Sequence, residues 1–276
     1  MHESAPVIRV QPTRGWVRLQ FRELWQYRGL LYFLTWRDVK VKYKQTTLGI
    51  SWAIIQPVLN TVIFTIVFGR FIGVRTPGNV AYEIFAFSSM LMWAFFANGL
   101  NSASASVVGN ANLISKVYFP RLIVPVSGVA GALPDFVVGF VVLLAVIPFY
   151  GLMPGITILL TPVFLLLAVL TALGVGIWLA ALTARYRDFR YVLPFLVQFW
   201  FFASPVAYSS AHITQPWRTL YGLNPMTGVI EGFRWAVLGQ QPPLAMLGLS
   251  VLIALFFLVT GLFYFRRVEK TFADLI

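Results

Sequence analysis

The chain has 276 residues, of which 59% are hydrophobic and only 11% are charged. Soluble domains usually carry about 25% charged residues, so this composition excludes a soluble fold and indicates a protein of the lipid bilayer. The absence of cysteine excludes disulfides, thiol catalysis and thiolate metal sites. The net charge of +12 is compatible with nucleic-acid binding, but membrane topology explains it better.

The first 47 residues carry charges throughout and contain no long apolar run, so they are not a secretory signal peptide. Residues 16–46 are predicted to form helices on the membrane surface. An aromatic stripe is flanked there by basic side chains: Tyr32, Trp36, Val39 and Tyr43 beside Arg37, Lys40 and Lys44. This pattern is typical of an amphipathic interfacial helix whose cations reach lipid phosphates. The alternative is that these charges only set the topology.

Four long windows without Asp, Glu, Lys or Arg predict the membrane-spanning helices. These windows are residues 45–69, 84–115, 136–184 and 235–265. A spanning helix needs about 20 apolar residues, so the third window is long enough for two helices, joined by a turn at 150–155. The spacing of apolar runs predicts about six spans. Their approximate ranges are 48–71, 84–107, 122–149, 156–183, 191–208 and 244–265.

The basic residues predict the orientation. Apart from Arg70, Arg75, Arg218 and Arg234, all Lys and Arg residues lie in segments 1–47, 108–121, 184–190 and 266–276. An even number of spans places these segments on one side, which the positive-inside rule identifies as the cytoplasm. We therefore expect cytoplasmic and interfacial helices over 1–47, a six-helix transmembrane domain over 48–265 and a cytoplasmic tail over 266–276. The expected location is the bacterial cytoplasmic (inner) membrane.

Residues 110–119 predict a short cytoplasmic helix between the second and third spans, ended by Pro120. Leu113, Ile114, Val117 and Tyr118 are expected on one apolar face, and such an exposed face requires a partner. The alternative is a loop embedded in the lipid headgroups.

Segment 209–243 is too polar and too often interrupted by proline to be a simple span. Val229, Ile230, Phe233 and Val237 share a helical face, and Glu231 lies three residues before Arg234. We predict short gate helices that enter the outer leaflet or cap the bundle between spans five and six.

Enzyme motifs are absent from the sequence. It contains no GxxxxGK[ST] phosphate loop, no HExxH and no GxSxG, so we expect neither nucleotide hydrolysis nor a metal site. Asp135 is the one acid within the predicted spans, which invites a functional hypothesis. The favoured alternative is that Asp135 satisfies free backbone N–H groups where a helix restarts after Pro134.

Four stretches resemble the membrane subunit of polysaccharide-exporting ABC transporters, the type-2 permeases that export O-antigen, capsule or teichoic acid. They are residues 37–57 (beginning RDVKVKYKQT), 110–121 (NANLISKVYFPR), 184–190 (ARYRDFR) and 223–234 (beginning LNPM and ending EGFR). Their order and their spacing relative to the spans match this family over nearly the whole chain.

The resemblance implies that residues 110–119 are a coupling helix that docks on a separate ATPase chain, with the 185–190 turn as a second contact. The implied coupling residues are Asn112, Leu113, Ile114, Lys116, Val117, Tyr118, Arg185, Arg187 and Asp188. The arginines of the turn are equally compatible with a topology signal. ATP and magnesium are expected on the ATPase, and no cofactor is expected on this chain.

The resemblance also implies a substrate path along the first and fifth spans. Each span carries phenylalanines on one face: Phe64, Phe68 and Phe71, and Phe195, Phe199 and Phe202. Sugars stack on aromatic faces, so these rings are candidate path residues. The alternative is that they contact lipid or neighbouring helices.

The leading hypothesis is therefore the permease subunit of an ATP-driven exporter of lipid-linked polysaccharide. The expected partners are a second copy of this chain, two ABC ATPase chains and membrane lipids, but not nucleic acid. One alternative is a type-2 permease for a drug or small lipid. Another is a membrane-embedded enzyme acting on a polyprenyl lipid, which would need clustered acids, histidines or serines at one depth.

Overall fold

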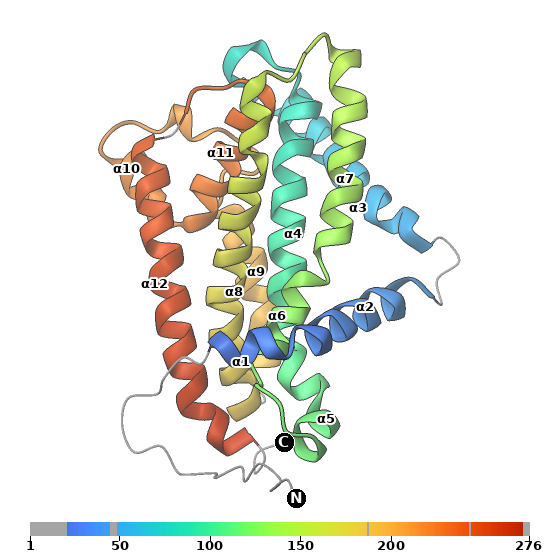
Figure 1. The fold of residues 1–276 in the computed structure, drawn as a ribbon. Coiled ribbons are helices and arrows are strands. Elements are labelled where there is room, and N and C mark those ends of the chain that lie inside the picture. The colour runs from blue at the N-terminus through green and yellow to red at the C-terminus, as the bar shows by residue number, and fades with distance from the viewer. Residues whose placement is uncertain (1–20, 45–48, 187, 243, 273–276) are drawn as a thin grey trace, which may run out of the picture.

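A computed structural model describes residues 21–44, 49–186, 188–242 and 244–272, and these residues contain helices and turns but no strand. Figure 1 shows a bundle of long helices crossed at one end by the helix α2. The α-helices are α1 Phe21–Gln26, α2 Arg28–Lys44, α3 Trp52–Phe64, α4 Tyr82–Gly109, α5 Ala111–Lys116, α6 Ile123–Ala130, α7 Leu133–Val146, α8 Thr161–Arg185, α9 Phe189–Phe202, α10 Trp217–Leu220, α11 Pro225–Leu238 and α12 Leu244–Val268.

Shorter helical turns extend these helices or connect them. A π-helical turn, η2 (Thr65–Phe71), continues α3. The 3₁₀ turns are η1 Gly49–Ser51, η3 Pro77–Asn79, η4 Ile147–Tyr150, η5 Ile156–Leu160, η6 Ser210–His212, η7 Tyr221–Leu223 and η8 Glu269–Thr271.

Within the described residues, five helical stretches are long and apolar enough to cross a membrane, which confirms an all-α polytopic membrane protein. They are Trp52–Phe71, Tyr82–Gly109, Ile123–Tyr150, Ile156–Arg185 and Leu244–Thr271. The predicted fifth span, 191–208, is shorter: α9 has 14 residues and ends at Phe202. Pro205 explains this end, because proline cannot donate a helical hydrogen bond and disfavours helical backbone just before it.

Helix α4 is the centre of the bundle and packs against α3, α6, α7, α8 and α11. Small residues allow the close approach of its neighbours. A Cβ atom on Gly128 of α6 would lie 2.9 Å from the backbone nitrogen of Ala103, and one on Gly174 of α8 would lie 2.7 Å from that of Leu258 in α12. In a membrane, where lipid tails are as apolar as side chains, such close packing is what holds helices together.

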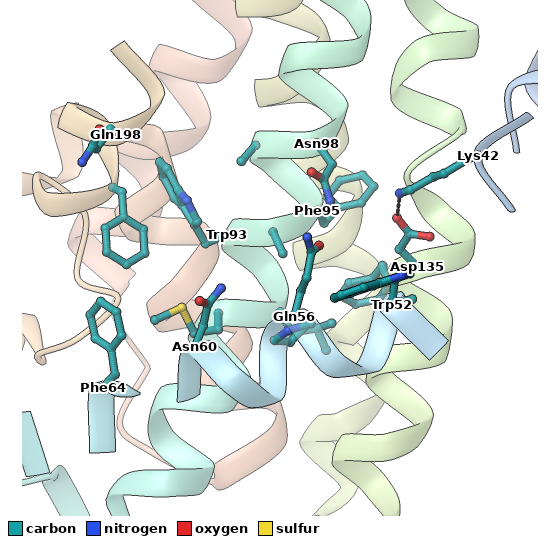
Figure 2. A pocket seen from close by; sticks show the side chains of 18 of the residues that line it. Lys42, Trp52, Gln56, Asn60, Phe64, Trp93, Phe95, Asn98, Asp135 and Gln198 are labelled. Carbon is teal, nitrogen blue, oxygen red and sulfur yellow. Dashed lines mark hydrogen bonds and ion pairs between the residues drawn. The ribbon is translucent and has the colours of Figure 1, made fainter. Parts of the chain in front are cut away.

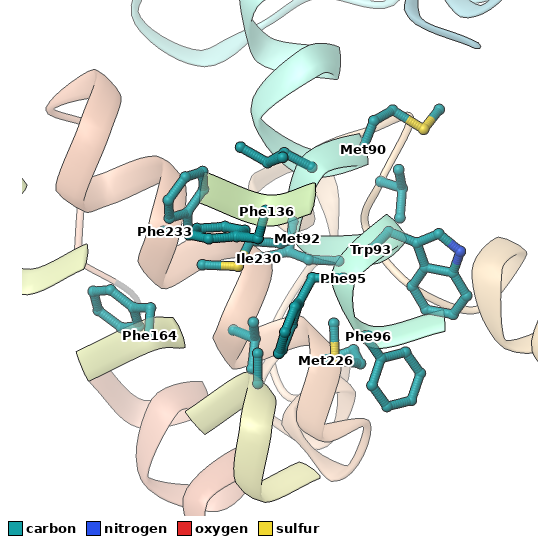
Figure 3. Packing of buried hydrophobic residues seen from close by; sticks show 14 of the residues in the cluster. Met90, Met92, Trp93, Phe95, Phe96, Phe136, Phe164, Met226, Ile230 and Phe233 are labelled. Atoms are coloured by element: carbon teal, nitrogen blue, oxygen red, sulfur yellow. The ribbon is translucent and has the colours of Figure 1, made fainter. Parts of the chain in front are cut away.

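Aromatic side chains fill the space where α4, α7 and α11 meet. Figure 3 shows Phe95 of α4 and Phe233 of α11 around Phe136 of α7. The ring centroids of Phe95 and Phe136 are 5.9 Å apart, and those of Phe136 and Phe233 are 6.1 Å apart. These edge-to-face contacts fix α7 and α11 against the central helix.

The helix α2 lies across the bundle near the end that carries α5, as Figure 1 shows. It buries Leu34 against the bundle and leaves Tyr32 and Trp36 exposed. The cation of Lys40 lies 5.5 Å from the ring of Trp36. Of the predicted surface helices over 16–46, residues 16–20, 45 and 46 lie outside the described residues.

Between α9 and α12 the chain forms η6, α10, η7 and α11, as short helices in place of a span. Figure 1 places α10 and α11 toward the end of the bundle opposite α5. Their role as a gate remains a prediction.

Candidate functional site

A cavity of about 530 Å³ lies between α3, α4, α7 and α9 and reaches α2. Figure 2 shows its mixed lining of rings, amides and one ion pair. The lining includes Lys42 of α2, Trp52, Gln56, Asn60 and Phe64 of α3, Trp93, Phe95 and Asn98 of α4, Asp135 and Phe136 of α7, and Gln198, Phe201 and Phe202 of α9.

The helical repeat of α3 explains its contribution to this cavity. Trp52, Gln56, Asn60 and Phe64 are spaced four residues apart, so they lie on one side of the helix over successive turns. This face places an indole, two amides and a phenyl ring along the cavity. The amides were missed by the sequence analysis, which sought charges and aromatic rings. Their spacing of four within an apolar span was the available signal.

The amides of the cavity are free to bind a ligand. The side chains of Gln56, Asn60, Asn98 and Gln198 have no hydrogen-bond partner in the described part of the chain. An amide offers two N–H donors and one carbonyl acceptor. The cavity therefore combines unused hydrogen-bonding groups with aromatic faces.

Aromatic contacts join α3 to α9 at one end of the cavity. The ring of Phe64 stacks on Phe68 with centroids 5.2 Å apart and meets Phe201 edge-on at 5.5 Å. Trp93 meets the same Phe201 ring at 5.4 Å. The sequence analysis did not select Phe201, although it lies beside Phe202 on the fifth predicted span.

The structure divides the six predicted path residues into three groups. Phe64 and Phe202 line the cavity, and Phe68 packs against Phe64. Phe71 and Phe195 are exposed on the bundle surface, outside the cavity lining. Phe199 lines a different pocket, with Trp200, between α8, α9 and α12. Whether any of them lines a substrate path stays a prediction.

Asp135 connects the cavity to α2. Its carboxylate accepts hydrogen bonds from the Lys42 ammonium and the Tyr43 hydroxyl. The interpretation that Asp135 satisfies backbone N–H groups is wrong, because helix α7 begins without any side-chain cap. The sequence could not reveal this, since Lys42 and Asp135 are 93 positions apart.

A second, strongly polar cavity of about 300 Å³ lies under α2. It shares Lys42 and Asn98 with the first cavity and is also lined by Asn101, Ser106 and Asn110 of the α4 end. Arg37 of α2 donates hydrogen bonds to Asn110, at 2.9 Å, and to Asp38, at 2.7 Å. Helix α2 therefore binds both the cavity wall and the junction of α4 with α5.

The predicted coupling helix over 110–119 is shorter in the structure, where α5 ends at Lys116. The prediction of one apolar face is wrong. Ile114 is buried in the bundle and Leu113 packs against the same cluster, whereas Val117 is 52% exposed and Tyr118 is 86% exposed. The backbone becomes extended at Val117 (φ −129°, ψ 134°), which ends the helical periodicity. Of the other predicted coupling residues here, Asn112 and Lys116 are exposed.

The second predicted contact lies at the α8–α9 connection, at the same end of the bundle as α5 (Figure 1). Arg185 and Asp188 are exposed, and the Arg185 guanidinium lies 5.3 Å from the ring of Tyr186. Arg187 lies outside the described residues. The ATPase-contacting role of these residues remains a prediction.

Glu231 and Arg234, the predicted gate pair, form a buried anchor. The Arg234 guanidinium lies 3.6 Å from Glu231, 3.6 Å from the centre of the Phe85 ring and 2.9 Å from the Val206 carbonyl. Glu231 accepts a hydrogen bond from the Ser210 N–H at 2.8 Å. Burial lowers the pKa of Arg234 to about 10, and the Glu231 carboxylate opposes that shift. The pair thus fixes the 206–210 segment to α11.

No group of three or more His, Cys, Asp and Glu side chains that could hold a metal ion occurs within the described ranges.

A helical membrane protein with a polar and aromatic cavity among its spans has the construction of a membrane transporter. A family model described as ABC-2 type transporter matches residues 29–238, from α2 to the last residue of α11. This chain belongs to the ABC-2 type transporter family. The matched region contains the cavity, α5 and the Glu231–Arg234 anchor.

Bacterial relatives match this chain almost from end to end. The O-antigen export system permease protein RfbA of Myxococcus xanthus is 30% identical over 254 residues, which cover 90% of this chain and 96% of the relative. RfbA of Klebsiella pneumoniae is 27% identical over 250 residues, covering 90% and 95%. The polysialic acid transport protein KpsM of Escherichia coli is 25% identical over 243 residues, covering 85% and 91%.

Proposed function

We propose that this chain is the membrane permease subunit of an ATP-driven exporter of lipid-linked polysaccharide. Its relatives are named for the export of O-antigen and the transport of polysialic acid. The observation that carries the proposal is the cavity in which two free amides of α3, Gln56 and Asn60, lie between the rings of Trp52 and Phe64. Sugar hydroxyls exchange hydrogen bonds with amides, and the apolar faces of sugar rings stack on aromatic side chains.

The proposed working form is a homodimer in the bacterial inner membrane, with both chain ends in the cytoplasm. The exposed surfaces of α3 and α9 support this proposal. Only 17% of the most apolar 18-residue stretch of Trp52–Phe71 is buried within the protein, and α9 exposes Tyr191 and Phe195. A second copy would cover α9 and the cavity-lining side of α3, where Trp52 is exposed, and would complete a path of which one chain supplies half.

The energy source in this proposal is a separate ATPase that holds ATP and magnesium. Its contact would include the exposed Val117 and Tyr118 beside α5. A displacement of α5 by the ATPase can reach the cavity through two hydrogen bonds of α2. Arg37 of α2 is hydrogen-bonded to Asn110 at the start of α5, and Lys42 of α2 is hydrogen-bonded to Asp135 in the cavity wall. A rigid α2 helix would carry the movement between these links.

The test deletes this chain from the cells that produce it, separately replaces its cavity amides, and quantifies surface polysaccharide in each case. We expect Asn60→Leu and Gln56→Leu to reduce surface polysaccharide at unchanged permease level, because leucine keeps the volume but offers no hydrogen bonds. The matched control is Ile63→Leu, on an exposed face of α3 that does not line the cavity. Undiminished surface polysaccharide in cells lacking the chain would refute the proposed function. Normal export by both amide variants would refute the proposed path.

A further inference from the structure

A groove separate from the amide cavity lies between α3, η2, α4 and α7 and has a volume of about 430 Å³. Its walls are aliphatic for most of its length: Val58, Val62 and Ile66 on one side and Val142 and Val146 of α7 on the other. Val58, Val62 and Ile66 are four residues apart and are exposed on the bundle surface. Because Trp52–Phe71 is long and apolar enough to span a membrane, we expect this exposed groove to face lipid.

One end of the groove is charged. Arg70 lies in the last turn of η2, Glu83 in the first turn of α4, and Tyr150 at the end of η4. All three residues line the groove and lie within about two residues of the end of a candidate span, at the depth of lipid headgroups. Neither Arg70 nor Glu83 has an ion pair or hydrogen bond to another described residue.

The π-helical turn aligns this charged end with a buried hydroxyl. In η2 the backbone bonds join residues five apart, as between the Ile72 N–H and the Val67 carbonyl at 3.0 Å. Arg70 follows Thr65 by five residues and therefore lies about one turn above it on a similar side of the helix. Thr65 is 8% exposed, lines the groove, and its hydroxyl has no hydrogen-bond partner in the described part of the chain. A buried polar group without a partner calls for a ligand or an ordered water.

We propose that this groove binds one phospholipid with a zwitterionic headgroup, of which phosphatidylethanolamine is the simplest. One acyl chain lies along the aliphatic walls, the phosphate binds Arg70, and the amine binds Glu83. The Thr65 hydroxyl lies a turn deeper, where it donates a hydrogen bond to an ester carbonyl of the glycerol backbone. This arrangement gives Arg70, Glu83 and Thr65 each a partner of matching charge or hydrogen-bonding capacity.

The charges favour this occupant over two others. A phospholipid with an anionic headgroup, such as phosphatidylglycerol, would satisfy Arg70 with its phosphate but has no cationic group for the Glu83 carboxylate. A polyprenyl phosphate would fill the apolar groove but has no amine for Glu83.

The experiment uses the full-length permease with its ATPase, in nanodiscs that carry a trace of lipid with a photoreactive group in the acyl chain. Parallel samples contain the phosphatidylethanolamine, phosphatidylglycerol or polyprenyl phosphate probe, and labelled peptides are mapped by mass spectrometry. We expect the phosphatidylethanolamine probe to label α3 and α7 at the groove about tenfold more than the phosphatidylglycerol probe, the usual effect of one charge-assisted contact.

The variants separate binding in the groove from general lipid contact. Arg70→Gln should reduce labelling by phosphatidylethanolamine about tenfold, and Glu83→Gln should remove its advantage over phosphatidylglycerol. Arg75→Gln, an exposed arginine that does not line the groove, should change neither. Equal labelling by the two phospholipids in the unmodified protein overturns the proposal, as does stronger labelling by polyprenyl phosphate. Cross-linking between Val62→Cys positions of two copies, with no lipid label, assigns the groove to the second copy and also overturns it.

Discussion

Replacing Arg234 by methionine tests the buried anchor between α11 and the 206–210 segment. Methionine keeps most of the side-chain length but removes the charge and every donor. The carboxylate of Glu231, now 3.6 Å from a guanidinium, would remain buried without its cation. The carbonyls of Val206 and Tyr208 would each lose a hydrogen bond, of 2.9 and 3.3 Å.

The size of the expected stability loss follows from the burial of the Arg234–Glu231 ion pair. Arg234 has 0% of its surface exposed and Glu231 has 7%, so water cannot replace the missing partner. Removing one member of a buried ion pair typically costs about 3–5 kcal/mol. That is a large part of the total stability of about 5–15 kcal/mol of an ordinary domain. Arg234→Lys should cost less, because it retains the charge but not the planar group that lies on Phe85 and bonds two carbonyls.

The assay is the thermal unfolding midpoint of the purified permease in detergent, followed by size-exclusion chromatography. A loss of this size should lower the midpoint by about 10 °C, taking a shift of roughly 2–4 °C per kcal/mol. The exposed Arg190→Met change is the control and should leave the midpoint unchanged. Adding Glu231→Gln to Arg234→Met should recover at least about 1 kcal/mol, because no unpaired charge is then buried. An unchanged midpoint in Arg234→Met, or no recovery in the double variant, would refute this reasoning.

Three further predictions concern export. Val117→Asp should abolish surface polysaccharide and weaken co-purification with the ATPase while membrane insertion stays normal, and normal export would remove Val117 from the contact. Phe64→Leu should reduce export more than Phe64→Tyr does, whereas Phe195→Leu, outside the cavity, should leave export unchanged. The measurement is surface polysaccharide at matched permease levels. The opposite ranking of the two Phe64 variants would contradict a sugar path. Lys42→Asp and Asp135→Lys should each impair export, and the double variant should restore at least part of it because the ion pair re-forms with its charges exchanged. If both single variants and the double variant are equally inactive, the attraction between the two residues is not what export requires.

The membrane-spanning architecture was predictable because it depends on composition along the chain. Charge-free windows of sufficient length specify helices in a bilayer, where every backbone group must be bonded within its own segment. Four of the five long spans agree with the predicted ranges within a few residues, and the last extends further, to Thr271. The predicted fifth span was too long, since apolar composition continues past Phe202 while Pro205 ends the helix.

The candidate site was only partly predictable. Phe64 and Phe202 were selected as aromatic residues of the right spans, and both line the cavity. The periodicity of residues 110–119 was misleading, because it assumed a helix that continues through Val117. The structure ends the helix at Lys116, three residues before the predicted end, and Ile114 turns inward while Val117 and Tyr118 stay exposed.

The sequence by itself determined the class of fold and the absence of a nucleotide-binding loop, since each depends on residues close together in the chain. Only the tertiary structure decided which polar groups meet. It paired Asp135 with Lys42, joined Arg37 to Asn110, and gathered Gln56, Asn60 and Asn98 around one cavity. These partners are far apart in sequence, and their contacts depend on how the helices rotate and cross. That geometry is set by close packing of small residues and rings, which leaves no short-range pattern in the chain.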